Sequence, residues 1–174
     1  MKFKPSYTSS IAEDIMAERL IRAQAVEFLA DAPMRLKSGL ISPVYVDNRK
    51  LFSHPEAWRD IVETMASRVE EYDLEFDIVA GVEAAGSMYA AALAYRLGLP
   101  AIMVRQKAKT YGNHSRIEGG DVKGMRVLLL EDHISTGLSC LDAIRALRGE
   151  GAQVTQVMSI TNYAIPETQR LFKQ

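Results

Sequence analysis

Two adjacent carboxylic acids followed by a run of small and hydroxyl residues are the feature of this sequence best suited to chemistry. Glu131 and Asp132 come directly after the apolar run 127–130, and residues 135–139 read Ser-Thr-Gly-Leu-Ser. The two acids can accept hydrogen bonds from a pair of neighbouring hydroxyls, as on a ribose. The backbone N–H groups of a glycine-containing loop at the start of a helix attract a phosphate. The pattern therefore predicts a binding site for a sugar phosphate.

Such a loop needs a strand before it and a helix after it. The leucine-rich run 127–130 is typical of a strand buried on both faces, and residues 140–148 have a helical pattern. The expected order is strand, acid pair, loop and helix. The alternative is a strand that ends in a solvated acidic turn, in which Ser135 and Thr136 serve only as helix caps.

A second group of candidate residues lies in and beside the polar segment 107–120, which lacks apolar periodicity. Its cations, together with the one just before it, are Arg105, Lys107, Lys109 and Arg116. Charges of this kind usually mark a solvated loop. Beside an anion-binding loop they would instead stabilise the negative charge that develops on a phosphate leaving group. A long unpatterned loop in a compact domain is also commonly functional.

Most of the chain predicts alternating strands and helices. We expect strands at 77–82, 101–105, 127–130 and 154–161, helices at 55–72, 84–97 and 140–148, and a short closing helix from Pro166. This alternation indicates an α/β fold with a mostly parallel sheet. The carboxyl ends of parallel strands meet at one edge of a sheet, so the loops 83–87, 105–120 and 131–139 should converge on one ligand.

The N-terminal part of the chain is less regular. Apolar residues within 11–29 fall near helical spacing and predict one helix that ends near Pro33. Two extended pieces are expected at 34–37 and 44–47, with a turn between them. No internal repeat or domain-sized linker interrupts the sequence, so residues 1–174 are expected to form a single domain.

The composition is that of an ordinary globular protein. Hydrophobic residues make up 48% and charged residues 25% of the chain, and the formal net charge is -1. This balance gives no reason to expect nucleic-acid binding, and no stretch approaches the length of a membrane span. Cys140 is the only cysteine, so no intramolecular disulfide can form and a cytoplasmic location is expected.

The strand, acid pair and loop, in this order, resemble the signature with which type I phosphoribosyltransferases bind phosphoribosyl diphosphate (PRPP). Over roughly residues 28–162 the sequence is similar to the orotate phosphoribosyltransferase family. Residues 36–47 look like that family's N-terminal substrate segment, and 105–112 with 117–119 look like its mobile catalytic loop. The resemblance implies helices on both faces of a mostly parallel sheet, with a small hood formed by the N-terminal segment.

By this resemblance the chain would transfer the phosphoribosyl group of PRPP to orotate in pyrimidine biosynthesis, giving orotidine 5′-monophosphate and diphosphate. Magnesium would be carried by PRPP and not held by the protein alone. The catalytic residues would be Lys109, Arg105 and Asp132. PRPP would be bound by Arg105, Gln106, Lys109, Tyr111, Glu131, Asp132, Ser135, Thr136, Gly137, Leu138 and Ser139, and the base by Lys37, Tyr45, Ser135 and Tyr163. Family members are homodimers that share the mobile loop between subunits, so Lys109 would act in the partner's site.

Two positions depart from the family pattern. Gln106 stands where the family usually has Lys, and Tyr163 stands where it has an Arg that pairs with orotate. A phenol is no substitute for a planar guanidinium that grips a carboxylate. Two alternatives therefore stay open: transfer to a different base, or a non-catalytic protein that senses PRPP or a nucleotide. His133, where an aliphatic residue is usual, is more readily interpreted as structural than as catalytic.

Overall fold

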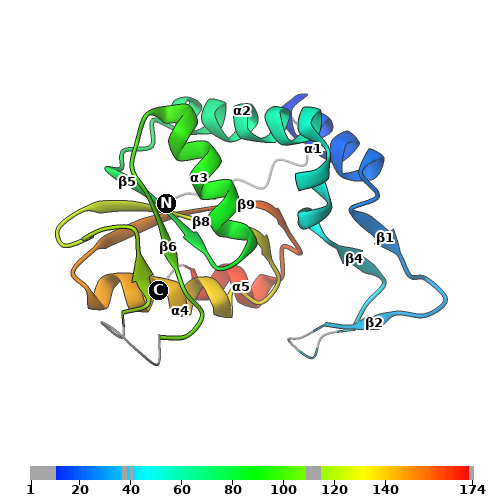
Figure 1. The fold of residues 1–174 in the computed structure, drawn as a ribbon. Coiled ribbons are helices and arrows are strands. Elements are labelled where there is room, and N and C mark those ends of the chain that lie inside the picture. The colour runs from blue at the N-terminus through cyan, green and yellow to red at the C-terminus, as the bar shows by residue number, and fades with distance from the viewer. Residues whose placement is uncertain (1–10, 37–38, 40, 109–114, 173–174) are drawn as a thin grey trace.

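A five-stranded sheet forms the centre of the molecule in the computed structural model, which describes residues 11–36, 39, 41–108 and 115–172 (Figure 1). Its strand order is β7-β6-β5-β8-β9. The four longer strands are parallel, and the short β7 runs antiparallel to β6. Their bounds are β5 (Ile78–Val82), β6 (Ala101–Val104), β7 (Ile117–Glu118), β8 (Arg126–Ile134) and β9 (Gln153–Asn162). The predicted mostly parallel α/β sheet is confirmed.

Helices cover both faces of this sheet (Figure 1). Helices α2 (Pro55–Glu71) and α3 (Ala85–Leu97) lie on one face, and α4 (Leu138–Gly149) and α5 (Pro166–Leu171) lie on the other. Alternate residues of β8 therefore enter different cores: Leu128 and Leu130 pack with α2 and α3, while Leu129 packs with α4. Burial on both faces explains why this strand has a continuous apolar sequence.

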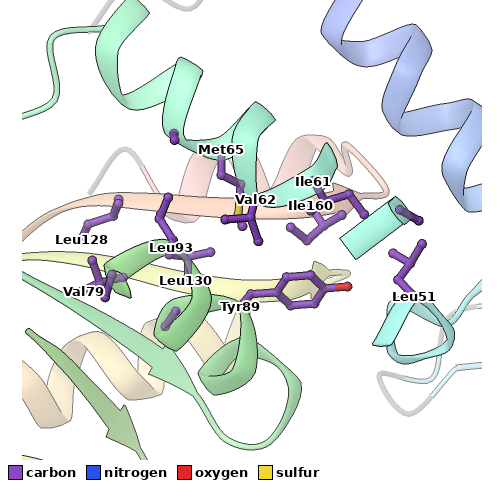
Figure 2. Packing of buried hydrophobic residues seen from close by; sticks show 14 of the residues in the cluster. Leu51, Ile61, Val62, Met65, Val79, Tyr89, Leu93, Leu128, Leu130 and Ile160 are labelled. Carbon is purple, nitrogen blue, oxygen red and sulfur yellow. The ribbon is translucent and has the colours of Figure 1, made fainter. Parts of the chain in front are cut away.

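Tyr89 is the largest fully buried side chain of the core between α2, α3 and the sheet. Its ring stacks on Trp58 with 4.8 Å between centroids. Figure 2 shows the ring reaching from α3 towards the short 3-10 helix η1 (Asn48–Ser53). There its hydroxyl donates a hydrogen bond of 2.9 Å to the carbonyl oxygen of Asn48. The buried phenol is thus satisfied, and it fixes the position of η1 over the sheet.

The predicted N-terminal helix over 11–29 is wrong beyond its first half. Helix α1 covers Ile11–Arg22, after which Gln24 adopts a positive φ of 53° that ends the helix. The next residues form β1 (Val26–Phe28), which pairs with β4 (Val44–Val46) in an antiparallel ladder. Helical spacing within the sequence gives no sign of this distant partner.

The hood consists of two small antiparallel ladders beside the main sheet. The first is β1 with β4, and the second is β2 (Met34–Arg35) with β3 (Ile41–Ser42). The extended pieces expected at 34–37 and 44–47 are confirmed over residues 34–35 and 44–46, although they pair with other strands and not with each other.

Strand β8 is longer than predicted, because it continues to Ile134 and not only to residue 130. Its parallel ladder with β9 includes Glu131 opposite Ser159 and His133 opposite Thr161. The acid pair therefore lies inside the strand, where the sequence had placed it at the mouth of a loop. Backbone pairing with β9 is the reason, since it draws polar residues into the sheet regardless of their side chains.

The polar segment after β6 also contains a strand that was not predicted. Strand β7 pairs Ile117 with Val104, and two residues are too few to produce a pattern in the sequence. Lys109 and Tyr111 of this segment lie outside the described residues, as does Lys37 of the hood.

The order in which the chain adds strands to the sheet changes side at β5. The chain passes from β5 through α3 to β6 on one side, whereas β8 lies on the other side. The crevice at the carboxyl ends of β5 and β8 is therefore the expected ligand site. Among the described helices, none is long and apolar enough to cross a membrane.

Two glycines bring α3 unusually close to the sheet at this point. A Cβ on Gly81 would lie 2.4 Å from the Cα of Ser87, and one on Gly86 would lie 2.7 Å from the carbonyl oxygen of Leu130. Backbone atoms cannot move aside as a flexible side chain can. These positions need glycine so that α3 can begin against the ends of β5 and β8.

We predict that Gly81→Ala lowers the free energy of unfolding by about 1–3 kcal/mol, because the new methyl group overpacks a backbone contact. The matched control is Gly149→Ala in α4, where an added Cβ meets nothing within 4 Å. This control should be neutral or stabilising by up to about 1 kcal/mol. Urea unfolding of both variants measures the difference, and equal stabilities would contradict the close approach of α3.

Candidate functional site

A cavity of about 240 Å³ lies at the carboxyl ends of β5 and β6, beside the start of α4. Val82 ends β5, Gln106 and Lys107 follow β6, and Leu138 and Ser139 begin α4 after β8. Arg116 and Asp142 complete the lining. The structure therefore brings the candidate loops together at the carboxyl edge of the sheet, as the alternation of strands and helices predicts.

The loop after β8 is shaped as an anion-binding turn. Gly137, with a φ of 77°, is the N-cap of α4, and no side chain caps this helix. The first N–H groups of a helix lack intrahelical partners and carry a positive partial charge. Ser135 and Thr136 are not the caps of the helix, so the alternative prediction that they cap it is wrong. Their side chains lie beside a helix start that is open to a phosphate.

Helix α5 supports this loop from behind. Thr168 Oγ1 donates a hydrogen bond of 3.0 Å to the carbonyl oxygen of Ser135, and Thr136 N donates to Ser135 Oγ at 2.7 Å. A Cβ on Gly137 would lie 2.8 Å from the ring of Phe172. The loop therefore needs glycine both for its positive φ and for this packing.

The two acids have different environments. Glu131 is 7% exposed, and its Oε1 accepts a hydrogen bond of 3.1 Å from the backbone N–H of Asp132. Burial, reinforced by the neighbouring Asp132 carboxylate, raises the pKa of Glu131 far above its ordinary value. Asp132 is only half-buried. Asp132 is therefore the better placed of the two to accept hydrogen bonds from ligand hydroxyls, with Glu131 neutral behind it.

Both described arginines of the site make ion pairs. Arg105 Nη1 lies 2.9 Å from Glu118 Oε1, and Arg116 Nη2 lies 2.6 Å from Asp142 Oδ2. Arg116 Nε also donates to the carbonyl oxygen of Arg105 at 2.8 Å. These contacts hold both guanidinium groups in place, and Arg116 is the one of the two that lines the cavity.

Gln106 joins the loop after β6 to the loop after β5. Its backbone N–H donates to Glu83 Oε2, and its Nε2 donates to the Glu83 carbonyl oxygen, both at 3.0 Å. The next peptide bond, between Glu83 and Ala84, is cis. The glutamine at this position thus has a structural role that fixes two of the three loops relative to each other.

Two of the residues predicted for the base, Tyr45 and Tyr163, lie at the hood side of the site. Tyr45 is half-buried in β4. The hydroxyl of Tyr163 donates a hydrogen bond of 2.9 Å to the carbonyl oxygen of Val44, and its ring meets His133 edge-on at 4.4 Å. Tyr163 is therefore directed at the hood strand that carries Tyr45.

Sequence reasoning missed two residues at this junction. Asn48 is fully buried, and its Nδ2 donates to the carbonyl oxygen of Asp132 at 2.6 Å and to Thr161 Oγ1 at 2.7 Å. Arg49, paired with Asp47 at 2.6 Å, brings a further cation to the same side. No local pattern marks Asn48, because its partners in β8 and β9 are far away in the sequence.

His133 is half-buried, and Cys140 is fully buried. Burial lowers the pKa of His133, so the ring is neutral at pH 7, and its Nδ1 lies 2.8 Å from Thr161 Oγ1. Cys140 is 1% exposed, and burial raises the pKa of its thiol. Within the described residues, no group of three His, Cys, Asp or Glu side chains could hold a metal ion.

Comparison with known proteins agrees with this geometry. The family model for the phosphoribosyl transferase domain matches residues 47–171. The orotate phosphoribosyltransferase of Coxiella burnetii is 45% identical over 157 residues, which cover 90% of this chain and 75% of that protein. The crystal structure of the Aeropyrum pernix orotate phosphoribosyltransferase has a TM-score of 0.71 and 27% identity, covering 91% of this chain and 99% of that one.

A third comparison concerns a liganded structure. The Mycobacterium tuberculosis orotate phosphoribosyltransferase in complex with PRPP has a TM-score of 0.62 and 22% identity, covering 91% of this chain and 93% of that one, which shows a shared fold. A mostly parallel sheet with an anion-binding turn after β8 defines the class as a type I phosphoribosyltransferase. The chain belongs to the orotate phosphoribosyltransferase family within that class.

We predict a pH dependence of stability that Glu131 causes. Because its folded-state pKa is raised above the ordinary 4.5, its contribution is fully present below pH 4.5 and is lost as the pH rises towards the folded-state value. Relative to Glu131→Gln, the parent should lose up to about 1.4 kcal/mol of stability per pH unit between pH 5 and 8. Urea unfolding at several pH values measures this.

The control is Glu150→Gln at the exposed end of α4. Its pH profile should run parallel to that of the parent. A Glu131→Gln profile that also ran parallel would show that Glu131 titrates normally in the folded protein.

Proposed function

We propose that this chain transfers the 5-phosphoribosyl group of PRPP to orotate, giving orotidine 5′-monophosphate and diphosphate in pyrimidine biosynthesis. The observation that carries the proposal is the turn at Gly137, whose helix start has no side-chain cap, together with the half-buried Asp132 in the last part of β8. One such site can take both the phosphate and the hydroxyls of a ribose phosphate. Membership of the orotate phosphoribosyltransferase family supports orotate over the two alternatives, a different base or a non-catalytic sensor.

The proposed roles follow the three loops. Ser135, Thr136, Gly137, Leu138 and Ser139 take the 5′-phosphate, and Glu131 and Asp132 form the ribose side, with Asp132 accepting the hydroxyl hydrogen bonds. Arg105, Gln106, Lys109 and Tyr111 form the diphosphate side. Lys37, Tyr45, Ser135 and Tyr163 form the base side. The cavity supports these roles, because Gln106 of the diphosphate side and Leu138 and Ser139 of the phosphate turn all line it.

In the reaction, the bond between the ribose C1 and the diphosphate oxygen breaks while a ring nitrogen of orotate bonds to C1. Negative charge grows on the departing diphosphate, and Lys109 and Arg105 stabilise it. Arg105 is now paired with Glu118, and a phosphate carries more charge than that carboxylate. Asp132 and the turn at Gly137 keep the ribose in place, so the chain mainly orients reactants.

Magnesium enters this proposal as a companion of PRPP. When bound to the diphosphate it would neutralise part of the charge that develops there. Asp132 offers the hard carboxylate oxygen that this ion prefers, and it would be the protein's contact to an ion carried by PRPP.

We further propose a cytoplasmic homodimer in which each 174-residue chain acts as one domain and Lys109 serves the neighbouring subunit. The outer face of α3 supports a partner surface, since Met88 is 49% and Tyr95 is 91% exposed. The single buried cysteine suits a reducing compartment.

We expect purified protein with PRPP, Mg²⁺ and orotate to lower the absorbance of orotate as the product forms. Turnover should require all three components. Unchanged absorbance, combined with PRPP-dependent diphosphate release on another base, would establish a different acceptor. Tight PRPP binding without turnover on any base would establish a sensor.

Lys109→Ala tests the leaving-group role. We expect kcat to fall by about a hundredfold or more, with a much smaller change in the Kd for PRPP, because the charge that Lys109 stabilises appears only as the bond breaks. Lys123→Ala is the matched control, since Lys123 precedes β8 at the opposite edge of the sheet. Its kinetics should equal those of the parent. Equal losses in kcat and PRPP affinity for Lys109→Ala would contradict the assigned role.

A further inference from the structure

The hood strand that carries Tyr45 is attached to the main sheet just before this residue. Tyr163, which follows the end of β9, donates its hydroxyl hydrogen bond to the carbonyl oxygen of Val44 at 2.9 Å. The same oxygen accepts a hydrogen bond of 2.6 Å from Ser42 Oγ. The backbone at Val44 is thus held by both the hood and the sheet.

A second attachment follows Tyr45 by three residues. Asn48, which is fully buried, donates from Nδ2 to the carbonyl oxygen of Asp132 at 2.6 Å. Its own carbonyl oxygen accepts the hydroxyl of the buried Tyr89 at 2.9 Å. Tyr45 therefore lies on a short segment whose two ends are both fastened to the sheet near Asp132.

His133 connects the two attachments. Its ring meets Tyr163 edge-on, with 4.4 Å between centroids and 79° between planes. Its Nδ1 lies 2.8 Å from Thr161 Oγ1, which also accepts a hydrogen bond of 2.7 Å from Asn48 Nδ2. Since that oxygen already accepts from Asn48, its hydroxyl proton is free to point at the histidine. The two attachments thus belong to one network at the carboxyl ends of β8 and β9.

We propose that Tyr163 is a positioning residue that, by holding Val44, sets the distance between the Tyr45 ring and Asp132. The proposal rests on the proposed function, in which Tyr45 contacts the base and Asp132 holds the ribose hydroxyls. Tyr163 then acts on the base through the hood. It determines how the base is presented to the ribose.

The hydrogen-bonding capacity of a phenol supports this indirect role. Tyrosine has one O–H donor, and that of Tyr163 is used on Val44. A carboxylate on the base accepts hydrogen bonds only, so it gains no donor from this side chain while the hood is attached. Tyr163, which stands where the family has an arginine, therefore attaches the hood strand to the main sheet through its hydroxyl.

Tyr163→Phe tests the proposal because it removes only the hydroxyl. We expect the KM for orotate to rise about three- to tenfold, the effect of losing one neutral hydrogen bond, while kcat and the Kd for PRPP change less than about twofold. Amide hydrogen exchange at residues 44–46 should become faster by a similar factor. Tyr72→Phe is the control, because Tyr72 is 62% exposed at the end of α2 and should change neither measurement.

A double-mutant cycle separates an indirect role from direct contact with the base. In a Tyr45→Leu background, Tyr163→Phe should have no further effect on the KM for orotate, since the hydroxyl acts through Tyr45. Additive effects would show that Tyr163 contacts the base itself and would overturn the proposal. An unchanged KM in the single variant would overturn it as well.

Failure of the proposed function is distinguishable from failure of this inference. A parent protein that consumes no orotate would remove the assigned reaction, and the exchange measurement would then decide the attachment by itself. Faster exchange at residues 44–46 in Tyr163→Phe would support it. Exchange equal to that of the parent would refute it.

Discussion

Parallel pairing of β8 with β5 on one side and β9 on the other is the interaction on which the rest of the site depends. This pairing buries the leucine-rich half of β8 in two separate cores. It also places the polar half, with Glu131 and Asp132, at the carboxyl ends of the parallel strands. The anion-binding turn follows at once. Hydrophobic burial on both faces thus supplies the stability that holds a polar strand end in one place.

This arrangement has an electrostatic consequence. The glycine contacts of α3 close the space around Glu131, and burial favours the neutral form of its carboxyl group. Asp132, one residue further along, stays accessible. Two chemically similar residues therefore acquire different properties from their environments, because one is buried and the other is only half-buried.

The cations of the site are held less firmly than its backbone. The Arg105–Glu118 and Arg116–Asp142 pairs are partly exposed, and ion pairs of this kind contribute about 1 kcal/mol or less to stability. A diphosphate could therefore draw these guanidinium groups to itself at little cost. The turn at Gly137 differs, because α5 and the positive φ of the glycine fix its backbone before any ligand arrives. The structure thus combines a backbone turn held by tertiary contacts with cations in partly exposed ion pairs.

The sequence by itself determined the parallel sheet, the order of its helices and the turn after β8, because the residues responsible are neighbours in the chain and their patterns are local. Only the tertiary structure decided the base side. The Tyr163–Val44 and Asn48–Asp132 hydrogen bonds join residues 119 and 84 positions apart, and the β1–β4 ladder replaced a helix that local spacing favoured. The burial of Glu131 could not be predicted from the sequence either, because it depends on how closely α3 packs against β8. Contacts between distant segments leave no periodic trace in a sequence, so they appear only once the chain has folded.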